Sequence, residues 1–306
     1  MPTLYIHTGL HKTGTTSLQK AFFDNRAALA RQNVLYPDAG LSQKPFNWGH
    51  HELAYAMRRR AGAQALWQSL RDEADASGLD KILVSSEELS LLPFPHFPGA
   101  EPYKLIAKIF EGYEIRHITY LRPQAELICS LYNHNVKAVG ERRDILEFIA
   151  DVTPRLEYQH YLNVAALGLG VQSIIVRRYT PQHLIDSDII SDIADLTGID
   201  LDNGFDRPKA PLNPGLSSKG LEAMLLANRR YAEQPLRLQA ERKRIIAQHP
   251  ASAFHRPSLL TDEARSLIEA LYLQKNRMVA RRYLGSDEEL FTPEPDMAPA
   301  SAISES

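Results

Sequence analysis

The sequence has almost no cysteine and no long apolar run. Its one cysteine, Cys129, excludes an intrachain disulfide and is typical of a protein from a reducing compartment. Cys129 lies in an apolar stretch and is expected to pack as a small hydrophobe. No stretch approaches the roughly 18 apolar residues of a membrane span, and the N-terminus lacks the basic start and apolar segment of a signal peptide. These absences predict a cytoplasmic protein with no membrane span.

An excess of either charge is also missing. The formal net charge is -2 at pH 7, and acidic and basic residues are mixed along most of the chain. The composition therefore predicts no nucleic-acid partner, although a local basic cleft stays open. With 306 residues, 44% of them apolar, the chain is long enough to bury a large core.

Short apolar runs alternate with longer amphipathic stretches over the first two-thirds of the chain. The runs are rich in β-branched and aromatic residues, which is typical of strands covered on both faces. We expect strands at 3–8, 33–36, 81–85, 114–121 and 171–177. Helical patterns occupy 15–32, 51–77, 103–111 and 124–139. This alternation predicts an α/β fold with a five-stranded parallel sheet wrapped by helices.

The pattern changes after about residue 206. A loop rich in proline and glycine follows, and helical patterns then dominate at 218–233, 237–248 and 261–282. We therefore expect an α/β core at 1–206 and a helical region at 207–290 packed on the same domain. The tail at 291–306 contains three prolines and small polar residues, so we expect it to be disordered.

The most informative segment follows the first predicted strand. A loop containing Gly9 and Gly14 leads directly into a predicted helix. Backbone N–H groups and the helix dipole favour an anion at such a helix start. The two glycines have the spacing of the nucleotide-triphosphatase loop G-x-x-x-x-G-K-[ST], but Thr15 stands where that loop needs lysine, and Lys12 is the loop's lysine. A kinase or ATPase would therefore lack its usual phosphate-binding lysine.

A second candidate anion site lies at the end of the fourth predicted strand. Arg122 ends that strand, and Ser130 follows eight positions later in a predicted helix. An arginine fork suits phosphate oxygens, and a serine two turns into the helix can add a hydroxyl on the same side.

Together, Lys12-Thr13-Gly14-Thr15-Thr16 and the Arg122 to Ser130 spacing resemble the sulfotransferase superfamily, most closely its bacterial members and the carbohydrate (heparan-type) enzymes. The resemblance implies a P-loop NTPase-like, three-layer α/β/α fold that binds 3′-phosphoadenosine 5′-phosphosulfate (PAPS) and releases 3′-phosphoadenosine 5′-phosphate (PAP). It places Lys12 at the bridging oxygen or the transferring group, and Arg122 with Ser130 at the 3′-phosphate. The donors to the 5′-phosphosulfate would be Thr13, Gly14, Thr15, Thr16 and Ser17.

Two softer matches leave alternatives open. Tyr179 follows the fifth predicted strand, where family members often place an aromatic residue near the adenosine, but a core tyrosine at a strand end fits equally well. Lys219, followed by Gly220, is similar to the family's late basic-glycine loop near the 3′-phosphate, although a solvated lysine is the better interpretation.

Sulfuryl transfer also needs a group that takes the acceptor's proton. Glu87 lies just beyond the third predicted strand, at the edge where open α/β sheets place their ligands, and heparan-type enzymes place a glutamate base after a comparable strand. Glu87 and its neighbour Glu88 could instead simply start a helix. His51, beside His50, is the alternative base. No metal-ligand cluster is apparent, and no metal is expected.

The sequence thus predicts a PAPS-dependent sulfotransferase acting on a hydroxyl of a small molecule or a glycan. The alternatives are a P-loop-like kinase using ATP and a non-catalytic nucleotide-binding protein. We expect acceptor-binding loops near 41–51 and 91–102, and the apolar helices after Gly215 offer a face for a homodimer.

Overall fold

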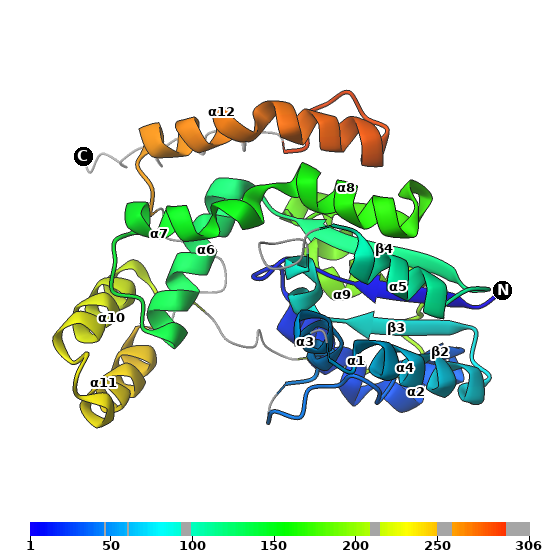
Figure 1. Cartoon of the computed structure of the whole chain (residues 1–306). Coiled ribbons are helices and arrows are strands. Elements are labelled where there is room, and N and C mark those ends of the chain that lie inside the picture. The colour runs from blue at the N-terminus through cyan, green and yellow to red at the C-terminus, as the bar shows by residue number, and fades with distance from the viewer. Residues whose placement is uncertain (46, 60, 93–98, 209–214, 250–258, 292–306) are drawn as a thin grey trace, which may run out of the picture.

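The computed structural model describes residues 1–45, 47–59, 61–92, 99–208, 215–249 and 259–291. A parallel sheet lies between two layers of helices, and further helices extend from its edge (Figure 1). The tail predicted to be disordered lies, apart from Phe291, outside the described residues, as does 93–98 in one of the expected acceptor loops.

The described residues form a sheet of five parallel strands in the order β2-β3-β1-β4-β5. Thr3 at the start of β1 pairs with Lys81 on one side and Glu114 on the other. The strands are β1 (Thr3–His7), β2 (Val34–Leu35), β3 (Lys81–Ser85), β4 (Glu114–Leu121) and β5 (Ile174–Arg178). This arrangement confirms the predicted P-loop-like, three-layer α/β fold class.

Alternate residues of each strand pack into different cores, because successive side chains of a strand point to opposite faces. In β1, Leu4 and Ile6 join one hydrophobic cluster, whereas Tyr5 packs against the other. The first cluster lies under α3 (His51–Arg59), α4 (Ala63–Ser77), α5 (Glu101–Ile109) and α8 (Tyr158–Leu169). The second lies under α1 (Thr15–Asp24), α2 (Arg26–Arg31) and α9 (Ile189–Thr197).

The connections change face at the central strand. The helices that follow β1 cover the second face, whereas those that follow β2, β3 and β4 cover the first. In open α/β sheets, such a change opens a crevice at the carboxyl ends of the strands, where ligands bind. Figure 1 shows α6 (Gln124–His134) and α7 (Ile145–Val152) beyond that edge.

The C-terminal helices are tied to α6. Asn133 of α6 exchanges two hydrogen bonds with the backbone of Leu216, at 2.9 and 3.0 Å. Asn228 donates to the carbonyl of Val136 at 2.8 Å. The helices are α10 (Ser218–Arg230), α11 (Pro235–Gln248) and α12 (Asp262–Val279), and apolar side chains of all three join the first hydrophobic cluster. Within the described ranges, no helix is both long and apolar enough to cross a membrane.

Several predicted helices differ from the observed ones. The segment 15–32 divides into α1 and α2 at Asn25, whose amide bonds the carbonyls of Ala21 at 2.7 Å and Asp206 at 2.9 Å. The segment 51–77 divides into α3 and α4. Helices α7, α8 and α9 were not predicted, and β5 begins three residues later than expected because 171–173 form a 3₁₀ turn.

Candidate functional site

The loop after β1 is held in a fixed shape at the start of α1. Lys12 and Gly14 both have left-handed backbone angles, with φ of 71° and 78°. The buried Thr13 hydroxyl donates to the carbonyl of Leu10 at 2.6 Å. Gly14 is the N-cap of α1, and no side chain from the described residues caps the helix. The first N–H groups of α1 and the positive end of its dipole therefore remain available to an anion.

Gly14 leaves little space for a side chain. A Cβ atom there would lie 3.0 Å from the Tyr179 hydroxyl and 3.2 Å from Ile189 Cγ2. Tyr179 comes directly after β5, and its backbone N–H donates to the carbonyl of Leu121 at 2.6 Å. The loop and the predicted adenosine-binding tyrosine therefore lie side by side.

Arg122 and Lys12 meet at the ends of neighbouring strands. Arg122 is only 5% exposed, and its Nη1 donates to the carbonyl of Lys12 at 3.2 Å. Its Nε and Nη2 each donate to Glu126 Oε2 at 3.3 Å. Ser130, half-buried, lies two turns further along α6. The two predicted anion-binding segments thus meet at Arg122 and Lys12, at the edge of the sheet.

Positive charge accumulates around Lys12. Burial, together with the nearby charges of Lys137 and Arg122, lowers the pKa of Lys12 to about 8, although Glu87 partly offsets these effects. Burial also lowers the pKa of Lys137, which lies in the π-helical turn Asn135–Val139 after α6. A buried group of like charges favours the binding of an anion.

Lys137 and the neighbouring His134 were missed by the sequence analysis. Burial, together with the positive charges of Lys12 and His11, lowers the pKa of His134 to about 4. The signal that could have found them is their spacing from Ser130, because positions four and seven residues further along a helix lie on the same face.

The predicted base lies on the other side of the loop, after β3. Glu87 opens the 3₁₀ helix Glu87–Leu91, and its Oε2 accepts a hydrogen bond from Gln19 Nε2 at 2.8 Å. His51 Nε2 lies 4.0 Å from the same oxygen, and His51 Nδ1 lies 2.8 Å from Ser86 Oγ. The two rival bases predicted from the sequence are therefore neighbours. Gln19, which lies on α1, was not predicted to take part.

Glu88 and His50 have structural partners instead. Burial alone would raise the pKa of Glu88, but the hydrogen bond from His11 and the ion pair with Arg58 lower it to about 2. Such a weak proton acceptor is unsuited to act as the base. His50 lies between the Ser85 N–H and the Pro37 carbonyl, at 3.1 and 3.0 Å, and burial lowers its pKa to about 4.

Two further residues have no close tie to this site. Lys219 is exposed in the first turn of α10, and its side chain has no hydrogen bond or ion pair with another described residue. Cys129 is half-buried against the first hydrophobic cluster, as expected. Across the part of the chain that the structure describes, no three His, Cys, Asp or Glu side chains group as ligands for a metal ion.

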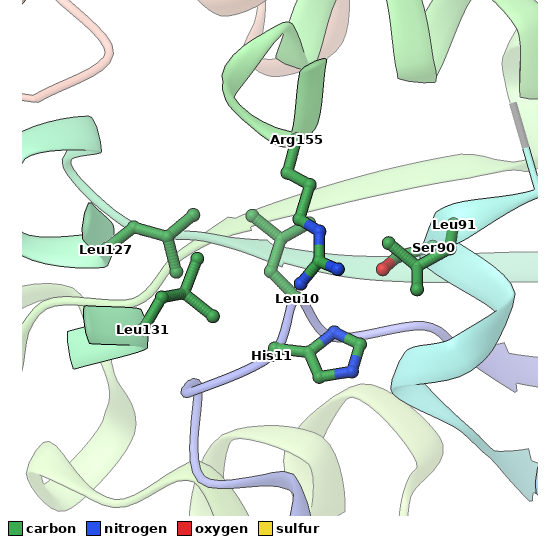
Figure 2. Close-up of a pocket in the computed structure, with 7 residues that line it drawn as sticks. All are labelled: Leu10, His11, Ser90, Leu91, Leu127, Leu131 and Arg155. Atoms are coloured by element: carbon green, nitrogen blue, oxygen red, sulfur yellow. The ribbon is translucent and has the colours of Figure 1, made fainter. Parts of the chain in front are cut away.

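A small pocket opens beside the loop, between α6 and the segment after β3 (Figure 2). Leu10 and His11 of the loop line it, and Arg155 enters from the 3₁₀ helix Thr153–Leu156. The pocket lies next to both Lys12 and the Glu87 helix. Sequence analysis did not find it, because its lining comes from four separate segments.

Comparison with known proteins yields one structural similarity. No protein-family model matches the sequence, and no curated protein matches it. The crystal structure of a sulfotransferase from Alicyclobacillus acidocaldarius is similar to this chain, with 15% sequence identity and a TM-score of 0.42. The alignment covers 78% of this chain and 95% of that chain. At this similarity, the activity has to be argued from the residues of this chain.

Proposed function

We propose that the protein transfers a sulfuryl group from PAPS to a hydroxyl acceptor. One observation carries this proposal: Lys12, the uncapped start of α1 and the buried Arg122 lie next to one another at one edge of the sheet. These groups present backbone N–H donors and two cations to the same region, which suits a ligand with two separate phosphate-type groups.

The residues present fit such a donor. The N–H groups of Thr15, Thr16 and Ser17 at the start of α1 would bind the 5′-phosphosulfate, with Lys12 beside it. Arg122 and Ser130 would hold the 3′-phosphate, and Lys137 would add charge to the same side. Tyr179 would lie against the nucleotide, since its hydroxyl is next to Gly14.

The chain's own groups would drive the transfer through proton removal and charge stabilisation. Glu87 would take the proton of the acceptor hydroxyl as the acceptor oxygen forms its bond to sulfur. The donor, when bound, supplies the sulfuryl group, and the bond from sulfur to the bridging oxygen breaks with its electron pair leaving on the nucleotide phosphate. Lys12 would stabilise the charge that develops on that leaving oxygen. The products are PAP, a sulfate ester and a proton.

Glu87 is the preferred base because one oxygen of its carboxylate already has two polar neighbours. Gln19 holds one of its oxygens at 2.8 Å, and His51 lies 4.0 Å from the same oxygen. We propose that His51 acts as a positioning residue for Glu87, because its Nδ1 is already engaged by Ser86.

Calorimetric titration with PAP tests the donor site. We expect micromolar binding to the wild type and a loss of about 100-fold or more in Arg122→Ala, because two charge-assisted contacts are worth several kcal/mol. Arg122→Lys keeps the charge without the fork and should fall between the two. Arg142, which is exposed, provides the matched control, and Arg142→Gln should bind PAP as the wild type does.

Three results would overturn the proposal. A wild-type protein that does not bind PAP has no donor site of this kind. Tighter binding of ATP with magnesium than of PAP would favour the kinase alternative. If PAP binds but no hydroxyl compound is sulfated in an acceptor screen with labelled PAPS, the non-catalytic nucleotide-binding alternative holds.

A further inference from the structure

The pocket beside the loop has apolar walls and one half-buried cation. Leu10, Leu91, Leu127 and Leu131 form the walls. Ser90 and His11 supply polar atoms at its rim, and the Arg155 side chain extends toward His11 and Leu10 (Figure 2). The empty space amounts to about 250 Å³, a figure that includes the part open to solvent.

Among the described residues, no hydrogen bond or ion pair joins the Arg155 guanidinium to another side chain, and Arg155 is half-buried. Burial lowers its pKa, the carboxylate of Glu88 acts in the opposite direction, and Arg58 lowers it further. A half-buried cation without a counter-ion loses part of its hydration, and an anionic ligand would offset that loss.

The carboxylate that acts on Arg155, that of Glu88, already has other partners. Glu88 pairs with Arg58 and accepts from His11 Nε2, which lies 3.4 Å from its Oε1. Arg58 and Arg155 together therefore carry one more positive charge than Glu88 neutralises. The surplus charge lies on Arg155, at the pocket.

The residues that line the pocket are close in the structure to Lys12 and Glu87, the two groups that would carry the proposed reaction. His11 precedes Lys12 in the chain, and Ser90 Oγ donates to the backbone carbonyl of Glu87 at 2.7 Å. A molecule in the pocket would thus lie between the donor loop and the 3₁₀ helix that carries the base.

We propose that this pocket binds the acceptor, and that the acceptor is a small hydroxy compound with an apolar body and a carboxylate or similar anionic group held by Arg155. This inference rests on the proposed sulfuryl transfer and specifies its substrate class. The leucine walls take the apolar body, and the guanidinium fork takes the anion in a bidentate contact.

Ligand binding to the protein–PAP complex tests this assignment. The probes are para-hydroxybenzoate, para-hydroxyphenylacetate and mandelate, each compared with its neutral primary amide by saturation-transfer NMR. We expect the wild type to bind at least one carboxylate about tenfold or more tightly than its amide. Arg155→Gln should lose this preference, Arg155→Lys should keep part of it, and Arg142→Gln should keep all of it.

The test separates this inference from the proposed function. PAP affinity is measured on the same variants, and Arg155→Gln should leave it unchanged. If the wild type fails to bind PAP, the proposed function fails, while the probe preference is still measured on the nucleotide-free protein. The acceptor assignment is wrong if no carboxylate binds, if amides bind equally well, or if the preference survives in Arg155→Gln. It is also wrong if Arg155→Gln weakens PAP binding, because Arg155 would then belong to the donor site.

Discussion

On the side of β4, the loop after β1 faces cations, whereas on the side of β3 it faces a carboxylate and an imidazole. We call these the donor side (Arg122, Ser130 and Lys137) and the acceptor side (Glu87 and His51). Both lie at the carboxyl edge of one parallel sheet, because β3 and β4 are the two neighbours of β1.

The difference shows how one loop can lie between a site for an anion and a site for a proton acceptor. Each neighbouring strand delivers its own end to the loop, so an anion site and a proton-accepting site can lie next to each other without sharing residues. Lys12 is the point of contact, since its pKa responds to Arg122 and Lys137 on one side and to Glu87 on the other.

The largest effect is expected from Glu87→Gln. Removing the base should lower kcat by about 100- to 10,000-fold while leaving the affinity for PAP unchanged. Glu88→Gln is the matched control and should cost less than about tenfold in kcat, because Glu88 is bound to Arg58 and His11 rather than free to take a proton. Steady-state kinetics with labelled PAPS and calorimetry with PAP give the two readouts.

Two outcomes would contradict this division of roles. If Glu87→Gln weakens PAP binding as strongly as it lowers kcat, Glu87 does not belong to a separate acceptor side. If His51→Gln abolishes turnover while Glu87→Gln does not, the histidine is the base.

A smaller effect, confined to the donor side, is expected from Gly14→Ala. The new methyl group would lie 3.0 Å from the Tyr179 hydroxyl, so the loop has to shift, and PAP affinity should fall by about tenfold or more. Gly62 is a matched control, because it is the N-cap of α4 with φ of 72° and nothing within 4 Å of a new Cβ. Gly62→Ala should lose about 1 kcal/mol of stability without changing PAP affinity. Equal effects of the two substitutions on PAP affinity would show that backbone strain alone is responsible.

The smallest effect is a change of PAP affinity with pH. Lys12 has a pKa of about 8 in the free protein, and a bound anion should raise it, so binding takes up a proton. Affinity should therefore be highest below pH 8 and fall by up to about tenfold per pH unit above it. Calorimetry on Lys12→Met should show weaker binding and no such slope. A wild-type affinity that stays constant across this pH range would mean that Lys12 does not face the bound phosphates.

Local sequence patterns predicted the parts of the site that are built within one segment. The strand, glycine loop and helix from β1 into α1 follow one another in the chain, and Arg122 occupies the end of a strand with a clear β pattern. Helix α8 was missed because it is buried on most of its surface and lacks the polar stripe that marks a surface helix. In α9, the buried Asp192 interrupts the apolar pattern, and only the fold supplies its partners Tyr120 and Arg177.

The sequence by itself determined the order of the five strands and the position of the glycine loop after the first of them, because backbone preference and hydrophobic period act over a few neighbouring residues. The tertiary structure decided which of the two acidic residues, Glu87 or Glu88, is available to accept a proton. Glu87 meets Gln19, which is 68 positions away, whereas Glu88 meets Arg58, which is 30 positions away. It also brought Arg155 to the loop. Charge pairing and burial depend on such distant contacts, which form only when the helices pack on the sheet, and no local pattern records them.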